Sequence, residues 1–301
     1  MEKLQGTAKG LMVGTLAGIA TGLLGFFLAL GHSGMGWVMF FLVPVVSGFC
    51  IAMVTRYPST MKAAALFALL ISLLILLALG KEGPLCALMA LPFLAIGLVI
   101  GVLLGALVRR ITRPAWEQTT TSMLLVAAPL VIFTGQKIEQ PFLEHGRIET
   151  ISTTVRIPGP PDRIWPYIQS IDSIHVPKPW LMYVGLPIPQ RCTLEKTAAG
   201  ARRTCYFNSG YIEETVTEWN PPYSMTLRID RTHMSGRHWL GFENAYYRLQ
   251  PDGNTTLLTR TTTISSHLSP VWYWRPLERW GVTSEHSYIL NEAARRAAAH
   301  Y

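Results

Sequence analysis

Two adjacent glutamates are the clearest source of acid–base chemistry in the C-terminal half of the chain. Glu213 and Glu214 lie in a segment that alternates like a β-strand, and neighbouring residues of a strand face opposite sides of a sheet. One of them therefore faces the interior, where a carboxylate needs a partner such as Arg228 or Arg260. A carboxylate in an apolar cavity can orient a ligand or act as a catalytic base, and a structural ion pair is the alternative.

A histidine near the C-terminus is the second candidate. His286 lies in the segment that we expect to form the last helix, where it can act as an acid, a base or a hydrogen-bond donor if it faces a cavity. The alternative is a histidine that is bonded inside the core or exposed to solvent. His233, His238 and His267 do not lie at the spacing of a zinc site, and no cysteine joins them. We therefore expect no metal, and no phosphate-loop or nucleophile motif indicates a cofactor.

Two cysteines are placed to form a disulfide. Cys192 and Cys205 are equally distant from the centre of the turn at 197–200, so the simplest hairpin register sets them opposite each other on neighbouring strands. A disulfide there would suit an oxidising compartment. Two half-buried thiols in a different register are the alternative.

The composition divides the chain into an apolar N-terminal part suited to a membrane and a more polar C-terminal part suited to water. Half of the 301 residues are hydrophobic and only 15% are charged, against about 25% in an ordinary soluble protein. The net charge of +8 is concentrated beside apolar segments, since residues 1–136 contain eight basic and three acidic residues. This distribution indicates membrane topology, and we expect no binding to nucleic acid.

Residues 1–136 are expected to form a polytopic membrane domain, followed by a linker at 137–146. The apolar segments are long enough to cross a bilayer as helices, and we place about five transmembrane helices at 8–30, 36–54, 62–80, 84–108 and 120–136. We expect an integral protein of the inner or plasma membrane. Loops rich in Lys and Arg alternate with nearly uncharged loops, and this pattern places the N-terminus in the cytoplasm. If the short fifth segment spans, the C-terminal domain lies on the extracytoplasmic side.

Glycines recur at every fourth position in two of these segments. This spacing lets helices approach closely, either within the chain or along the seam of a homo-oligomer, and it can also open a groove to lipid. The apolar stretches of the first four segments, at about 11–30, 36–54, 63–79 and 84–108, contain no Asp, Glu, Lys or Arg, which argues against an ion-coupled transporter. The glycines are Gly14, Gly18 and Gly22 in the first segment and Gly97, Gly101 and Gly105 in the fourth.

Residues 147–301 alternate like the strands of an antiparallel sheet and end in a long helical segment. A strand at 149–157 is followed by a short helix, by about six strands between 191 and 265, and by a helix from about 277 to 300. A curved sheet that grips a long helix leaves a cavity between the two. This half is therefore expected to be an α+β domain with a pocket.

The element order, together with three sequence stretches, resembles the START-related superfamily, which includes polyketide cyclases/dehydrases and lipid-transport proteins. The stretches are Pro161-Asp-Arg-Ile-Trp165, residues 200–216 with two arginines and two glutamates, and Trp219-Asn-Pro-Pro222. The resemblance covers about residues 147–299 and none of the membrane half. It implies a helix-grip fold that encloses a pocket for an apolar ligand, and it carries no universal catalytic motif.

Aromatic and apolar residues at inward positions are the expected lining of this pocket. The segment around Trp272 and Trp274 is rich in residues that prefer a membrane interface, so it is either a gate for an acyl chain or core packing. The candidates are Trp165, Phe207, Tyr211, Met225, Leu227, Tyr246, Trp272, Trp274 and His286.

Together these features predict a membrane-tethered domain that binds or transfers a hydrophobic ligand, such as a lipid or an isoprenoid, at the bilayer surface. A tether raises the effective concentration of a ligand that the bilayer supplies. One alternative is a cyclase or dehydratase that uses Glu214 or His286 on an apolar substrate. Another is a protein-interaction module whose cavity is filled.

Overall fold

The computed structural model describes all residues except 1, 31–33, 56, 113–116, 235–238 and 300–301. The chain forms two compact units, which we describe separately. The helical unit contains most of residues 1–146, and the C-terminal unit contains residues 147–266 and 271–301.

The helical unit contains three long apolar helices among its described residues. Candidate membrane spans run over Thr7–Ala29, Pro58–Ala78 and Pro84–Ile111, and each is long and apolar enough to cross a bilayer. The elements are α1 (Glu2–Leu30), η1 (Val38–Leu42), α2 (Val43–Val54), α3 (Pro58–Ala78), α4 (Pro84–Thr112) and α5 (Glu117–Leu143).

The other two predicted spans do not reach this standard in the described residues. The second predicted span is the apolar helix Val38–Val54, which begins as a π-helix and is shorter than the three long ones. The fifth predicted span, at 120–136, lies inside α5, but the side chains of 117–126 are outside the described part of the chain. The observed number of long apolar helices is therefore three, and a crossing by α5 stays a prediction.

The glycine ladders pack against helices of the same chain. A Cβ atom added to Gly18 would lie 2.7 Å from both Ala68 and Ile51, and one added to Gly101 would collide with the backbone carbonyl of Val45. Only glycine permits these close approaches. Neighbouring helices cover both residues, so these two glycines serve packing within the chain, and a homo-oligomer through the ladders stays a prediction.

The continuous helix formed by η1 and α2, Val38–Val54, is bonded at both ends by side chains from other helices. The Glu139 carboxylate accepts hydrogen bonds from the backbone N–H of Trp37 at 2.5 Å and of Val38 at 3.1 Å. At the other end, Arg109 donates to the carbonyl of Ala52 at 3.1 Å and to the carbonyl of Thr55. Helix ends leave backbone groups unsatisfied, and these two charged residues satisfy several of them without water.

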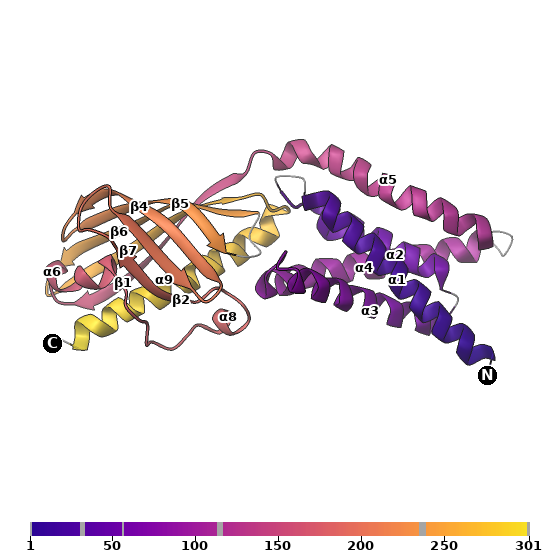
Figure 1. The fold of residues 1–301 in the computed structure, drawn as a ribbon, viewed down its shortest axis with the longest axis horizontal. Coiled ribbons are helices and arrows are strands. Elements are labelled where there is room, and N and C mark those ends of the chain that lie inside the picture. The colour runs from indigo at the N-terminus through magenta and orange to yellow at the C-terminus, as the bar shows by residue number, and fades with distance from the viewer. Residues whose placement is uncertain (1, 31–33, 56, 113–116, 235–238, 300–301) are drawn as a thin grey trace. The chain divides into compact units, whose positions relative to one another are not determined.

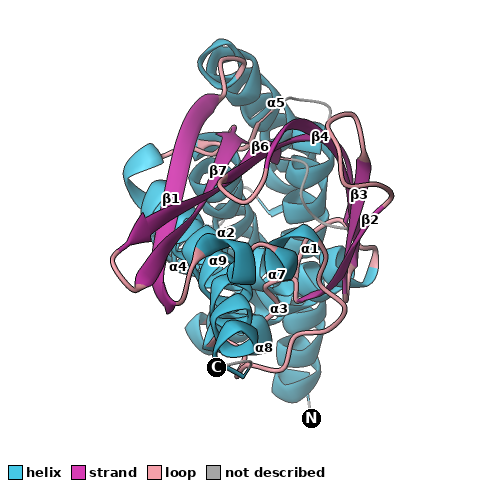
Figure 2. Ribbon diagram, turned by 90° about the vertical axis from the view of Figure 1, so that its left-hand side faces the viewer, coloured by secondary structure: helices cyan, strands magenta, loops and turns pink. Residues whose placement is uncertain are grey.

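The C-terminal unit is a curled seven-stranded antiparallel sheet on a long helix, α9 (Val271–Ala299). The sheet order is β1-β7-β6-β5-β4-β3-β2. Figure 1 shows the strands lying along α9, and Figure 2 shows them curving around it. The strands are β1 (Arg147–Pro158), β2 (Pro189–Leu194), β3 (Arg202–Phe207), β4 (Gly210–Asn220), β5 (Ser224–Met234), β6 (Leu240–Asp252) and β7 (Thr255–Ser266).

The inner face of the sheet follows from strict alternation along the strands. Every second residue of β7 is buried, from Thr256 to Ser266, and the intervening residues are more exposed. On α9 the buried positions recur at helical spacing, including Val282, Leu290 and Ala293. The main apolar core forms where this stripe meets the concave face.

Three short helices complete the unit between β1 and β2. They are α6 (Pro161–Ile164), α7 (Pro166–Gln169) and α8 (Trp180–Tyr183). The last helix also begins earlier than the sequence predicted, at Val271 instead of about Leu277. Pro276 removes one backbone hydrogen bond from this first part, and burial of Trp274 offsets that loss.

Candidate functional site

A layer of polar side chains crosses the otherwise apolar interior of the C-terminal unit, between the concave face of the sheet and α9. It contains both acid–base candidates, Glu214 on β4 and His286 on α9. Its other members are Arg203 on β3, Tyr247 on β6 and Arg260 on β7, all of them buried. We refer to these five residues as the polar layer.

Arg203 and Glu214 form a buried ion pair. Their side chains approach to 2.6 Å, and the Arg203 side chain, 2% exposed, also donates from Nε to the carbonyl of Gln169 at 3.1 Å. The partner of Glu214 is therefore Arg203, not Arg228 or Arg260 as the sequence suggested. Removing one member of such a pair strands a buried charge, at a cost of about 3–5 kcal/mol. This favours a structural role for Glu214.

The length of the turn between β3 and β4 could have identified Arg203 as the partner of Glu214. Two residues, Asn208 and Ser209, separate the strands, and the resulting register sets Arg203 directly opposite Glu214. A two-residue hairpin loop fixes its register, so the pairing could be read from the turn. Glu214 lies on the inner face with the buried Ile212 and Val216, because every second residue of β4 faces inward there.

Arg260 is bonded only in part. Its Nη1 donates to Glu285 on α9 at 3.0 Å, and its guanidinium lies 5.5 Å from the centre of the Tyr247 ring. The Nε atom is buried and has no hydrogen-bond partner among the described residues. An unsatisfied buried donor costs about 1–3 kcal/mol, so this N–H is available for an acceptor that is not part of the chain.

His286 is bonded on both ring nitrogens. Nδ1 lies 3.1 Å from the Thr153 hydroxyl, and Nε2 lies 2.8 Å from the Thr262 hydroxyl. Burial, reinforced by the positive charge of Arg260, lowers the pKa of His286 to about 2. The imidazole is therefore neutral at pH 7, which does not suit a proton donor in acid catalysis.

Several predicted lining residues belong to the apolar core. Met225, Leu227 and Trp165 lie in the main core cluster, and the Trp165 ring contacts Trp219 with centroids 5.3 Å apart. Phe207 packs against a smaller cluster that contains Ile171, Ile289 and both cysteines. These four side chains therefore pack in the core beneath the concave face.

Two predicted lining residues lie on the other face of the sheet. Tyr211 stacks on His233 with ring centroids 4.5 Å apart, and its neighbour Ile212 is the buried residue. Tyr246 likewise alternates with the buried Tyr247. The sequence identified the strands correctly, but a shift of one residue moves a side chain to the opposite face.

The two tryptophans at the start of α9 differ in exposure to solvent. Trp272 is 67% exposed, whereas Trp274 is 2% exposed and lies 6.3 Å from the Trp239 ring. Another exposed tryptophan of α9, Trp280, contacts Trp180 of α8 with centroids 5.1 Å apart. The start of α9 therefore combines a core anchor with an exposed aromatic surface.

The two cysteines of the first hairpin lie opposite each other. Cys192 and Cys205 are direct register partners on β2 and β3, and their sulfur atoms are bonded at 2.06 Å. The bond lies on the inner face and packs against Ile289 of α9. It ties the edge of the sheet to its neighbour beside the polar layer.

The histidines do not form a metal site in the described chain. No group of three or more His, Cys, Asp or Glu side chains could hold a metal ion there. His233 lies 3.8 Å from Glu213, and His267 is bonded to the carbonyl of Leu143. His238 lies outside the described residues.

Comparison with protein families gives one match. Residues 149–300 match the family described as polyketide cyclase / dehydrase and lipid transport. This range contains all seven strands and α9 except for the first two residues of β1. No curated protein matches the chain.

Solved structures resemble the C-terminal unit at low sequence identity. A norcoclaurine synthase from Thalictrum flavum is 10% identical, with a TM-score of 0.36 over 52% of this chain and 98% of that one. A Mesorhizobium loti protein is 15% identical, with a TM-score of 0.34 over 51% and 99%. A Mycobacterium smegmatis protein is 15% identical, with a TM-score of 0.35 over 52% and 98%.

The low pKa of His286 predicts how the stability of this unit depends on pH. The unfolded chain binds a proton on this histidine below about pH 6.5 and the folded chain does not, so acid favours unfolding. We expect the free energy of unfolding to fall by about 2 kcal/mol more between pH 7 and pH 5 in the wild type than in His286→Gln.

Urea unfolding of the full-length protein, followed by tryptophan fluorescence at both pH values, measures this difference. His145→Gln, which changes an exposed histidine, is the matched control and should keep the wild-type dependence on pH. Equal pH dependence in the wild type and His286→Gln would show that His286 is charged in the folded protein.

Proposed function

The chain belongs to the polyketide cyclase / dehydrase and lipid transport family, and from this premise we propose that its C-terminal unit binds a hydrophobic ligand between the sheet and α9. The family makes a hydrophobic ligand the first expectation for this fold. The single observation that carries the proposal is the unsatisfied Nε–H of Arg260 inside an apolar interior.

The polar layer indicates the chemistry of the ligand. Arg260 offers one N–H group beside the Tyr247 ring, and the core clusters on either side of the layer are apolar. An acceptor oxygen on the ligand would complete the bonding of Arg260, while the rest of the molecule would contact apolar side chains. The ligand is therefore an apolar chain or ring system with a carbonyl, hydroxyl or carboxylate oxygen.

Entry of such a ligand requires movement, because Trp165, Met225 and Leu227 pack against one another in the core. The α9 helix is the movable part, since its early segment combines the buried Trp274 with the exposed Trp272 and Trp280. Tryptophan prefers the boundary between water and lipid. We assign this aromatic surface as the route by which an apolar molecule passes from a bilayer into the unit.

The geometry gives less support to an enzyme. Glu214 is neutralised by Arg203, and His286 is neutral and bonded to two threonines. Neither side chain is free to move a proton in this arrangement. Ligand binding needs only the donor that Arg260 already provides.

The long apolar helices support a location in a membrane. We propose that they cross the bilayer together with the helix Val38–Val54 and α5, which makes five crossings and places the N-terminus in the cytoplasm and the C-terminal unit on the extracytoplasmic side. The basic residues near helix ends, including Lys9, Lys62 and Arg110, favour this orientation, and all three are exposed. The disulfide between Cys192 and Cys205 is consistent with an oxidising compartment.

A reporter fused after Tyr301 tests the topology. Alkaline phosphatase, which is active only outside the cytoplasm, should be active in this position, and a cytoplasm-dependent fluorescent protein should be dark. The same reporters fused within the loop near Lys62 should give the reverse pattern. A fluorescent C-terminal fusion would place the C-terminal unit in the cytoplasm and contradict the proposed crossing by α5.

A charge-balanced pair of variants tests ligand binding. Arg260→Met alone would strand the charge of Glu285, so the test variant is Arg260→Met with Glu285→Gln, and Glu285→Gln alone is the control. Full-length protein in lipid nanodiscs is exposed to a photoreactive fatty acid, and cross-linked peptides from β7 and α9 are quantified by mass spectrometry. We expect the double variant to show about a ten-fold loss of cross-linking, as for a charge-assisted hydrogen bond.

Glu285→Gln leaves the Arg260 charge without its carboxylate, so urea unfolding first confirms that this control is folded. The folded control should retain most of the cross-linking, because Arg260 keeps its Nε–H. Equal cross-linking in the double variant and the control would exclude Arg260 as the ligand donor. Absence of cross-links from β7 and α9 in the wild type would contradict ligand binding between the sheet and the helix.

A further inference from the structure

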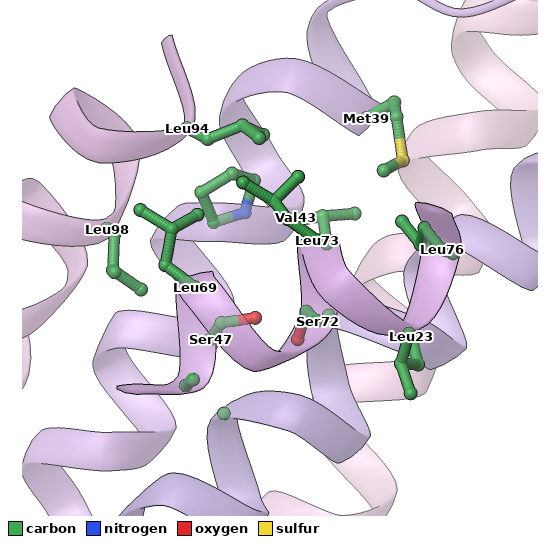
Figure 3. A pocket seen from close by; sticks show the side chains of 14 residues that line it. Leu23, Met39, Val43, Ser47, Leu69, Ser72, Leu73, Leu76, Leu94 and Leu98 are labelled. Atoms are coloured by element: carbon green, nitrogen blue, oxygen red, sulfur yellow. The ribbon is translucent and has the colours of Figure 1, made fainter. Parts of the chain in front are cut away.

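The helical unit contains a cavity that the proposed function does not use. It has a volume of about 70 Å³ and lies among α1, η1, α2, α3 and α4. Figure 3 shows its lining, in which leucines predominate and two serines are the only hydroxyl groups. The lining residues are Gly18, Gly22, Leu23, Met39, Val43, Pro44, Ser47, Ala68, Leu69, Ser72, Leu73, Leu76, Leu94 and Leu98.

Ser47 is the residue that points to a ligand. It is 5% exposed, and its hydroxyl has no hydrogen-bond partner among the described residues. Two other buried hydroxyls of this unit bond to the carbonyl four residues earlier: Thr21 bonds to Ala17 at 2.8 Å and Thr55 to Ile51 at 2.5 Å. Thr60 also has an unbonded hydroxyl, but it does not line the cavity. The Ser47 hydroxyl does not bond to the carbonyl four residues earlier, so its O–H can donate to an acceptor inside the cavity.

A glycine provides the space in front of this hydroxyl. A Cβ atom added to Gly22 would lie 3.8 Å from the Ser47 oxygen and 3.7 Å from the Ser72 oxygen, so both hydroxyls face one point above bare backbone. Figure 3 shows the two oxygens directed into the space between the helices. In contrast, a Cβ atom on Gly18 would lie 2.7 Å from its neighbours. Neighbouring side chains therefore pack directly against Gly18, whereas the space beside Gly22 is open enough for a Cβ atom.

Size and charge restrict what can bind here. The volume exceeds the space that one water molecule needs, about 10–15 Å³, and is smaller than the roughly 150 Å³ that admits an aromatic ring. None of the fourteen lining residues is charged, so an ionised group would lose its hydration without compensation. A narrow, uncharged chain with one oxygen meets both restrictions.

We propose that this cavity binds the short oxygen-bearing segment of a neutral lipid, and that Ser47, assisted by Ser72, holds a hydroxyl or carbonyl oxygen of that lipid. The lipid chain lies across Gly22 and contacts the surrounding leucines. The inference rests on the proposed membrane insertion of these helices, which would supply the lipid. It does not depend on ligand binding by the C-terminal unit.

Two photoreactive probes test the proposal on full-length protein in lipid nanodiscs: a long-chain fatty alcohol and the matching alkane without the hydroxyl. Peptides from α1, α2 and α3 are quantified by mass spectrometry after cross-linking. We expect the alcohol to label these peptides more strongly than the alkane. Ser47→Ala should lower labelling by the alcohol about five-fold, towards the level of the alkane, because one hydrogen bond is lost.

Filling the cavity provides the second arm of the test. Gly22→Leu should remove labelling of these peptides by both probes, whereas Gly10→Leu, on the same helix but outside the cavity, should not. Thr21→Val is the control for Ser47→Ala, because it removes a buried hydroxyl that does not line the cavity. Ser47→Ala removes a single oxygen, so it remains informative if Gly22→Leu fails to fold.

Two results would overturn the proposal. Equal labelling by the alcohol and the alkane, unchanged in Ser47→Ala, would show that the serine binds water only. Labelling that persists in Gly22→Leu would show that the chain binds elsewhere. Both results differ from a failure of the C-terminal site, which is read from β7 and α9 peptides with the fatty acid probe.

Discussion

The need to pair buried charges organises the interior of the C-terminal unit. A sheet that curls around α9 encloses a space where water cannot solvate Arg203 or Arg260. Glu214 pairs with Arg203 between the neighbouring strands β3 and β4, and Glu285 pairs with Arg260 between β7 and α9. The neutral His286 is buried in the same interior, where Thr153 and Thr262 provide the hydrogen bonds that water would otherwise provide.

Because buried polar groups need partners, the buried donors that lack one indicate where a ligand can bind. A folded interior ordinarily bonds its buried donors, and this one does so at most positions. The Nε–H of Arg260 and the hydroxyl of Ser47 are exceptions in two different units, and each lies within apolar surroundings. Each exception is therefore assigned to a ligand with one acceptor oxygen. In the helical unit the ligand chain would come from the bilayer, and the C-terminal unit would take its ligand through the aromatic surface of α9.

The sequence predicted the parts of the fold that depend on local pattern. Alternation identified the strands, the turn at 197–200 set Cys192 opposite Cys205, and the element order indicated a helix-grip domain. It did not give the face of Tyr211 and Tyr246, since a shift of one residue reverses the face. It also missed Arg203 as the partner of Glu214, although the two-residue turn at 208–209 implies that register.

Three of the five predicted spans are long apolar helices in the described part of the chain, and crossing by the other two stays a prediction. The segment Val38–Val54 is apolar throughout but shorter than the three long helices, and its ends are bonded by Glu139 and Arg109. These charged side chains satisfy backbone groups that water would otherwise solvate, which suits a helix surrounded by other helices. Hydropathy counts apolar residues and contains no information about such end contacts.

Hydrogen–deuterium exchange of the full-length protein in nanodiscs, with and without a saturating fatty acid, tests the central claim most directly. If the ligand enters between the sheet and α9, backbone exchange should slow in β7 and along α9, where the ligand orders the polar layer. The strands β2 and β3, tied by the disulfide, should change less. Unchanged exchange in β7 and α9 at saturation would contradict a ligand site in this interior.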